Sequence, residues 1–340
     1  MSELVAACSG RDVDRDGWPS VSVVVPVRNE GPHLERAVAS ILAQAYPVPF
    51  DVCLAVAPSD DDTFDVARRL SLGDDRVSMV ANPVGVTPAG LNAAIAATTG
   101  SIVVRVDGHA ELSDGYIRRA VETMCRTGAV NVGGMQVPQP ETPFEDAVAA
   151  ATTSWLGTGG ASYRVGGEAG PVDTVYLGVF DRTAGDAVGW FDERLIRNQD
   201  YELNIRLRAA GGVVWFDPAL SVGYRPRGTW KALAKQYYEY GFWKAEVLRM
   251  HPDSIKPRQA IPPIAMAAVT IGVVSATLGR RRALVVPVGY GLALAVEASR
   301  LGQRRVAPSL AVMHWGWSAG FWRRVGRPAV GSRASGTPPA

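Results

Sequence analysis

The chain has 340 residues, of which 47% are hydrophobic and 20% are charged, and its formal net charge is +2. This hydrophobic content is enough to bury a large core, so the composition excludes an intrinsically disordered protein. The small net charge gives no reason to expect a nucleic-acid partner. Positive charge is nevertheless concentrated in the last quarter of the chain, which predicts an anionic surface as its partner; the arginines are residues 280–282, 304, 305, 323 and 324.

Repeated strand–helix units follow an N-terminal extension over residues 1–20. Residues 21–27 predict a buried strand, and Leu34, Val38 and Ile41 lie on one face of the helix that follows it. The alternation continues through strand 52–56, helix 64–70, strand 76–80, helix 87–97 and strand 102–106. Such repeats predict an α/β fold with a mostly parallel sheet and helices on both faces.

The strand at 102–106 ends in Asp107-Gly108-His109. Ligands of open α/β sheets bind beyond the carboxyl ends of the strands. A carboxylate and an imidazole two residues apart are able to bind one divalent metal ion there. An aspartate that caps the next turn, beside an exposed histidine, explains the same residues equally well, so the motif alone leaves both interpretations open.

Several motifs in order over residues 21–252 resemble the family 2 glycosyltransferases with the GT-A fold. The branch that they resemble is the bacterial exopolysaccharide glucosyltransferases of the succinoglycan type. The motifs are Val25-Pro-Val-Arg-Asn-Glu30, Asn82-Pro-x4-Thr-x2-Gly90-Leu-Asn-x2-Ile95, Arg105-x-Asp107-x-His109, Val172-Asp-Thr-Val-Tyr-Leu-Gly178, Gly189-Trp-Phe-Asp-Glu193-x4-Asn198-Gln-Asp200-x-Glu-Leu-Asn204 and Gln236-x3-Tyr240-Gly-x-Trp243-Lys.

The resemblance implies an inverting transfer of sugar from a nucleotide-diphospho-sugar, with UDP-sugars the favoured donors. It implies Asp107 and His109 as ligands of Mn²⁺ or Mg²⁺, and the imidazole slightly favours manganese. It implies Asp200 as the base that accepts the proton of the acceptor hydroxyl. The donor-binding residues that it implies are Pro26, Glu30, Asp61 and Asp107.

The chain departs from the family pattern at two positions. Ala57 lies where family members carry an acidic residue that contacts the nucleoside, which leaves the nucleobase of the donor open. Gln199 replaces the usual acidic partner before Asp200, which favours the alternative of a catalytically idle subunit. Of the acids at 60–62, Asp61 fits the donor role best. Alternatively, these three acids only cap the helix near Phe64.

Residues 198–208 predict a helix capped by Asn198, which places Asp200 near the positive end of the helix dipole and keeps its carboxylate ionised. Alternatively, Asp200 and Glu202 only stabilise the helix through its dipole.

The acceptor side is predicted from two segments. Glycines recur through residues 157–170 around Tyr163 and Arg164, which indicates a mobile lid or, alternatively, a plain surface connection. Gln199 belongs to the same side. Gln236 and Trp243 resemble the Gln-x-x-Arg-Trp motif of processive relatives, but their spacing differs and no Arg-Trp pair is present.

The C-terminal part predicts membrane attachment. Residues 226–256 are basic and aromatic, as in an interfacial helix, unless the aromatic side chains simply pack in a core. A membrane region is predicted at 257–325. It contains nineteen uncharged residues at 261–279 and fourteen more at 283–296. A helix needs about 20 apolar residues to span a bilayer. Residues 326–340 predict a disordered tail.

Arginines 280–282 separate the two apolar stretches and leave their orientation open. The positive-inside rule puts these arginines on the cytoplasmic side, whereas two full spans from a cytoplasmic domain put them outside. A hairpin within one leaflet, or helices packed between subunits of a homo-oligomer, would remove the conflict.

The sequence therefore predicts a catalytic domain over residues 21–225, on the cytoplasmic face of the cell membrane, and a lipid-linked saccharide as acceptor. Two alternatives remain: a catalytically idle nucleotide-sugar-binding or scaffolding subunit, and an enzyme on soluble acceptors whose tail only localises it.

Overall fold

The computed structural model describes residues 17–327. The chain divides into two compact units, Met1–Arg227 and Gly228–Ala340. The predicted extension up to residue 16 and the predicted tail from residue 328 lie outside the described residues.

The first half of the N-terminal unit alternates strand and helix as the sequence predicts. Strands β1, β2, β3 and β4 are parallel, in the order β3-β2-β1-β4. The elements are β1 (Val21–Val27), α2 (Gly31–Leu42), β2 (Asp51–Val56), α3 (Thr63–Gly73), β3 (Val77–Ala81), α4 (Thr87–Ala96) and β4 (Ile102–Arg105).

The second half makes the sheet mixed, which corrects the expectation of a mostly parallel one. Beyond β4 the described strands continue in the order β8-β6-β9-β5, with β7 on β9, and only the β6–β9 pair among them is parallel. Successive βα crossovers place strands parallel, but the strands of this half are not all joined in that way. The spacing of apolar residues is the same in either direction of a strand, so it does not show which way the strand runs. The elements are β5 (Glu111–Leu112), α5 (Tyr116–Thr127), β6 (Asn131–Pro138), α6 (Pro143–Thr152), β7 (Gly170–Pro171), β8 (Tyr176–Asp181), α9 (Arg182–Val188), α10 (Gln199–Ala209) and β9 (Val214–Tyr224).

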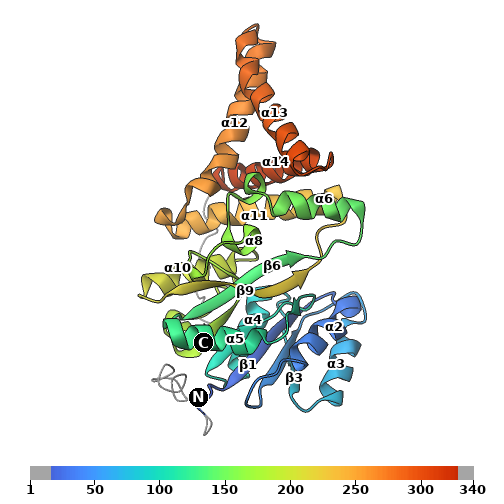
Figure 1. Ribbon diagram of the computed structural model, residues 1–340, viewed down its shortest axis with the longest axis vertical. Coiled ribbons are helices and arrows are strands. Elements are labelled where there is room, and N and C mark those ends of the chain that lie inside the picture. The colour runs from blue at the N-terminus through green and yellow to red at the C-terminus, as the bar shows by residue number, and fades with distance from the viewer. Residues whose placement is uncertain (1–16, 328–340) are drawn as a thin grey trace, which may run out of the picture. The chain divides into compact units, whose positions relative to one another are not determined.

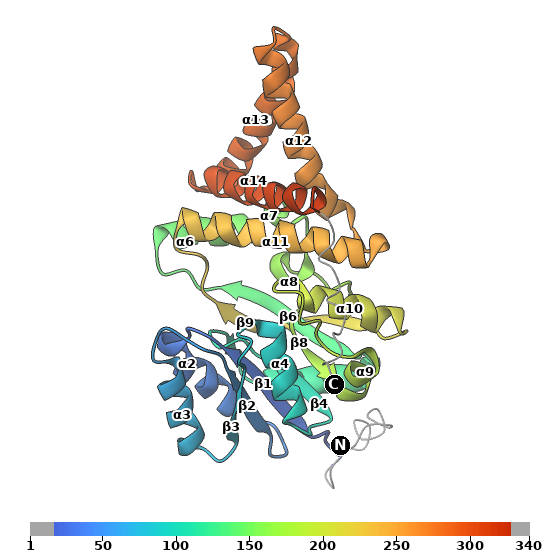
Figure 2. The ribbon, with the colours of Figure 1, turned by 180° about the vertical axis from the view of Figure 1, so that it is seen from behind.

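The sheet is buried on both faces. Side chains alternate along β1, so Val23 and Val25 join one apolar cluster with α2, α3 and α5, while Val24 joins another with α4 and α10. Figure 1 and Figure 2 show α5 and α4 on these opposite faces. Burial on both faces explains why β1 reads as an almost unbroken apolar run.

The glycine-rich segment contains more regular structure than the sequence suggests. It holds two short helices, α7 (Trp155–Thr158) and α8 (Ser162–Val165). Ser154 starts α7 by accepting a hydrogen bond from the backbone N–H of Gly157, and Gly159 ends it in the left-handed conformation. Some of these glycines therefore end short helices.

The C-terminal unit is helical. Its elements are α11 (Trp230–Met250), a turn of 3-10 helix at Pro252–Ser254, α12 (Pro257–Thr277), a second such turn at Arg281–Leu284, α13 (Val285–Arg300) and α14 (Val306–Val325). Helices α11 and α14 are in backbone contact: a Cβ atom at Gly241 would lie 1.8 Å from the Trp317 carbonyl oxygen, and one at Gly320 would lie 1.9 Å from that of Tyr238. Glycine at both positions is therefore required by the packing.

Helices α12 and α13 form a hairpin with an apolar surface. Ile264, Ile271, Val285 and Val296 are each more than half exposed. Two segments among the described residues, Pro257–Thr277 and Arg281–Arg300, are long and apolar enough to cross a membrane. The second is longer than the sequence analysis expected, because the helix continues through Glu297 to Arg300, which form an ion pair at 2.8 Å.

Candidate active site

The site lies at the point where the order of the parallel strands reverses. From β1 the chain moves outward to β2 and β3 and then returns to place β4 on the other side of β1. The loops that follow β1 and β4 diverge there, which is where ligands of open α/β sheets bind. Pro26 is a β1 residue opposite Ala55, and Glu30 follows in the loop.

Glu30 and His109 join these two loops. Nδ1 of His109 lies 2.7 Å from Oε1 of Glu30, although the residues are 79 positions apart. Gly108 permits this approach, because a Cβ atom there would lie 2.8 Å from a methyl carbon of Val27 and 3.1 Å from Cγ of Glu30. The contact sets the orientation of the imidazole.

Arg105 holds Asp107 from the same strand end. Side chains two residues apart lie on one side of an extended chain, and Nε and Nη2 of Arg105 donate to Oδ1 of Asp107 at 3.2 and 3.0 Å. Both bonds end on Oδ1, so Oδ2 of Asp107 has no hydrogen-bond partner among residues 17–327.

The charges of this cluster oppose the effect of burial. Burial alone would raise the pKa of Asp107, but the charge of Arg105, followed by that of His109, outweighs it and lowers the pKa below its usual value. Burial would lower the pKa of His109, but the hydrogen bond and charge of Glu30 raise it above its ordinary value. Asp107 is therefore a carboxylate at neutral pH.

Asp200 lies in the first turn of α10 and belongs to the same electrostatic cluster. Its carboxylate attracts the Arg105 guanidinium, and its Oδ1 accepts the backbone N–H of Tyr201 at 2.8 Å. Asn198 occupies the N-cap position, as predicted, but its backbone is left-handed (φ 62°) and its side chain forms no cap hydrogen bond. The expected capping by Asn198 is therefore wrong, and Asp200 itself satisfies one of the first N–H groups.

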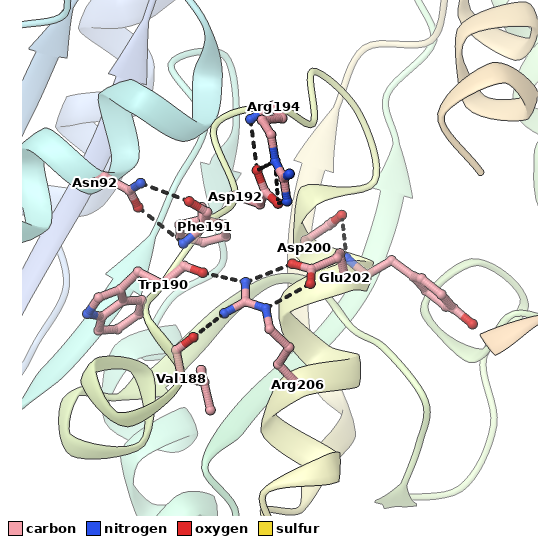
Figure 3. Close-up of polar contacts among 10 residues, drawn as sticks. Asn92, Val188, Trp190, Phe191, Asp192, Arg194, Asp200, Glu202 and Arg206 are labelled. Atoms are coloured by element: carbon pink, nitrogen blue, oxygen red, sulfur yellow. Dashed lines mark hydrogen bonds and ion pairs between the residues drawn. The ribbon is translucent and has the colours of Figure 1, made fainter. Parts of the chain in front are cut away.

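The loop that leads into α10 is held at two points, which Figure 3 shows. The Asn92 side chain donates to the Phe191 carbonyl oxygen and accepts the Phe191 N–H, at 2.8 and 3.1 Å. Arg206 donates to the carbonyl oxygens of Val188 and Trp190, both at 2.5 Å, and pairs with Glu202 at 2.7 Å. The path of the chain into Asp200 is thus fixed by α4 on one side and α10 on the other.

Asp61 serves the structure of the loops. Its Oδ2 accepts the N–H of Gly31, while Oδ1 accepts the N–H and hydroxyl of Thr63. The hydrogen bond from the Thr63 hydroxyl is the main reason why the pKa of Asp61 is lowered. Of the acids at 60–62, Asp62 occupies the N-cap position of α3 without a side-chain cap bond, whereas Asp61 accepts the N–H of Thr63. Asp61 therefore ties the loop after β1 to the start of α3.

The predicted acceptor-side residues fall into two groups. Arg164 lies over the rings of Tyr163 and Tyr224, at 5.6 and 5.8 Å, and donates to the Tyr224 hydroxyl. Gln199 is buried at the start of α10. Gln236 and Trp243 belong to α11 of the other unit, where Gln236 donates to the Tyr240 hydroxyl at 3.1 Å.

Sequence reasoning missed the supporting residues Arg105, Asn92 and Arg206. Arg105 and Asn92 lie within quoted motifs and Arg206 lies in the predicted helix at 198–208, but no role was assigned to any of them. The two-residue spacing from Arg105 to Asp107 is the one local signal that pointed to a contact. The contacts of Asn92 and Arg206 with the loop depend on the packing of separate elements.

Residues 22–187 match the family model of glycosyl transferase family 2. The chain is 33% identical over 318 residues to the succinoglycan biosynthesis protein ExoA of Rhizobium meliloti (strain 1021), covering 89% of this chain and 94% of that protein. It is 23% identical over 238 residues to a dolichyl N-acetyl-alpha-D-glucosaminyl phosphate 3-beta-D-2,3-diacetamido-2,3-dideoxy-beta-D-glucuronosyltransferase of Methanococcus voltae, covering 67% of this chain and 74% of that protein.

The fold is similar to that of the mannosyltransferase PcManGT from Pyrobaculum calidifontis, solved in complex with GDP-Man and Mn²⁺. The TM-score is 0.64 at 17% identity, over 95% of this chain and 93% of that one. This likeness supports the GT-A architecture and leaves the donor of this chain undetermined.

Proposed function

Since this chain belongs to glycosyl transferase family 2, we propose that it moves a sugar from a nucleotide-diphospho-sugar to an acceptor hydroxyl in the synthesis of a polysaccharide or glycoconjugate. The observation that carries the proposal is the meeting of Glu30, His109 and Asp107 in the loops that follow the paired strands β1 and β4. The similarity to a succinoglycan biosynthesis protein along most of both chains supports the substrate class.

Asp107 and His109 suit a divalent metal ion. No three His, Cys, Asp or Glu side chains form a metal-binding group in the part of the chain that the structure describes. A metal that binds together with substrate phosphates needs only one or two protein ligands. Oδ2 of Asp107 and Nε2 of His109 would supply them, because the Glu30 bond at Nδ1 orients the imidazole as in many metal sites.

When bound there, the ion would act as a Lewis acid toward the leaving diphosphate. Asp200 would accept the proton of the acceptor hydroxyl as its oxygen attacks the anomeric carbon and the nucleoside diphosphate leaves from the opposite side, which inverts the configuration. Arg206 and Asn92 support this role, because they hold the chain segment that leads to Asp200.

The donor would be bound by the loop after β1. Glu30 orients His109, Pro26 near the end of β1 would lie beside the nucleoside, and Asp61 stabilises the loop through Gly31. A UDP-sugar is the proposed donor. Tyr163, Arg164 and Gln199 line the proposed acceptor side, and Gln236 and Trp243 are proposed to assist from α11.

We infer membrane association from the α12–α13 hairpin, whose apolar side chains are exposed along most of its length. A membrane-bound enzyme meets a lipid-linked saccharide in two dimensions, which supports that acceptor class. The catalytic unit is proposed to face the cytoplasm. The hairpin also suits packing against a second copy of the chain.

The test is a donor screen with the full-length protein in detergent. Binding and slow hydrolysis of UDP-, GDP- and TDP-sugars are measured with and without Mn²⁺. Metal-dependent binding or hydrolysis of one donor is the expected result. A folded protein that binds none of these donors would contradict the transferase and favour a scaffolding subunit.

A further inference from the structure

Arg105 is a buried cation that interacts with both carboxylates to which the proposed function assigns different tasks. Its side chain is only 7% exposed. Two of its nitrogens bond Asp107, its guanidinium lies 5.9 Å from the centre of the Phe191 ring, and Asp200 attracts it. A guanidinium remains charged even when buried, so this charge persists at any working pH.

The hydrogen bonds of Arg105 are incomplete. Nη1 is buried and has no hydrogen-bond partner among residues 17–327. A buried, unpaired donor on a charged group is costly, and such groups are found where a function requires them. Asp107 already occupies the Nε and Nη2 edge, so Nη1 is the nitrogen of this guanidinium that no described residue satisfies.

One arginine serves two carboxylates. The charge of its guanidinium attracts both Asp107 and Asp200. The bonds to Oδ1 also prevent rotation of the Asp107 carboxylate, so that Oδ2 keeps one direction. Ligand positions that are fixed in this way bind metal more tightly.

We propose that Arg105 is a positioning residue, which presents Oδ2 of Asp107 to the metal and whose charge stabilises the Asp200 carboxylate. The inference rests on the proposed function, because it gives the two aspartates their roles. It adds a residue that contacts no reacting atom and on which both tasks depend.

Arg105→Met and Arg105→Lys test the metal part. Mn²⁺ affinity is measured by electron paramagnetic resonance in the presence of UDP, or of the nucleoside diphosphate that the donor screen selects. Arg105→Met is expected to lose about 10- to 100-fold in affinity. Arg105→Lys is expected to lose less, because it keeps the charge but not the two parallel bonds. Unchanged affinity in both variants would overturn the inference.

Arg182→Met is the matched control. Arg182 is a partly buried arginine at the other end of the sheet, where it donates to the carbonyl oxygens of Gly100 and Ile95. Its loss removes buried hydrogen bonds without touching Asp107 or Asp200, so Mn²⁺ affinity should stay at the wild-type value. If Arg105→Met does not fold, Arg105→Lys compared with this control decides the question.

Asp200→Asn tests the second part through thermal unfolding without metal. In the Arg105→Met background it should raise the melting midpoint, because it removes a carboxylate that has lost its counter-charge. In the Arg182→Met background, Asp200→Asn should not raise the melting midpoint. Equal shifts in both backgrounds would overturn the inference. If instead the wild type binds no Mn²⁺ with any nucleotide, the proposed metal dependence fails. The melting midpoints in the two backgrounds still test whether the Arg105 charge stabilises Asp200.

Discussion

The side-chain amide of Asn92 pairs with the backbone of Phe191 in both directions: it donates to the carbonyl oxygen at 2.8 Å and accepts the N–H at 3.1 Å. The two residues are 99 positions apart. Through this pair, α4 holds the loop that continues into Asp200, as Figure 3 shows.

Asn92→Ala should therefore destabilise the loop and slow transfer. The variant leaves the partly buried N–H and carbonyl of Phe191 unpaired, which costs about 1–3 kcal/mol. Thermal unfolding measures the loss of stability, and the transfer rate at saturating donor measures the loss of positioning. Asn92→Asp, which retains an acceptor for the Phe191 N–H, should fall between the wild type and Asn92→Ala; a wild-type melting midpoint in Asn92→Ala would contradict the pairing.

Asp200→Asn should lower the transfer rate by about 10²- to 10⁴-fold, because an amide does not accept the acceptor proton. Donor binding, measured by calorimetry with Mn²⁺ present, should be nearly unchanged. Asp186→Asn is a suitable control, because Asp186 accepts the indole N–H of Trp190 away from the proposed metal ligands. Loss of donor binding in Asp200→Asn would assign this residue to structure.

His109→Ala should weaken Mn²⁺ and donor binding together, since it removes a proposed ligand. Glu30→Gln should weaken Mn²⁺ binding by about 10- to 100-fold, the usual effect of losing the partner that orients a ligand. His33→Ala, in α2, serves as the control histidine variant. The metal role of His109 would be refuted if its variant required and bound manganese like the wild type.

Stability should fall in acid through Asp217. Burial alone would raise the pKa of this carboxyl, but hydrogen bonds from Arg119, the Ala219 N–H and Thr123 lower it below its usual value. A carboxyl with a lowered pKa in the folded state contributes stability above its unfolded pKa, and this contribution is lost as the pH falls through the folded value. Urea unfolding between about pH 2 and pH 6 should therefore show a smaller acid loss in Asp217→Asn than in the wild type. Identical slopes would exclude Asp217 as a source of the pH dependence.

Ile271→Asp should release the protein from membranes or prevent its insertion. Ile271 is 66% exposed on α12, and a carboxylate at the centre of a spanning helix costs about 2.5–3.5 kcal/mol. Membrane flotation of the expressed protein measures the effect. Val84→Asp, at a position of the N-terminal unit that is 65% exposed, controls for the added charge. Equal flotation of both variants would place the membrane contact elsewhere.

Local patterns of residues were enough to predict the elements that they encode. Alternation of apolar runs and amphipathic segments predicted β1 to β4 with their helices, because burial on one face or two imposes a period on the side chains. Asp107 and His109 were located at a strand end for the same reason, and the apolar composition marked the α12–α13 hairpin. These features depend on neighbours within a few residues.

Tertiary structure decided what depends on the order of the strands. Three features join residues far apart in the chain: the antiparallel half of the sheet, the bond between Glu30 and His109, and the attraction between Arg105 and Asp200. Local periodicity carries no information on which strands become neighbours, since many strand orders bury the same apolar faces. The proposed metal ligands could therefore be named from the sequence, whereas the residues that orient them became visible only once β1 and β4 lay side by side.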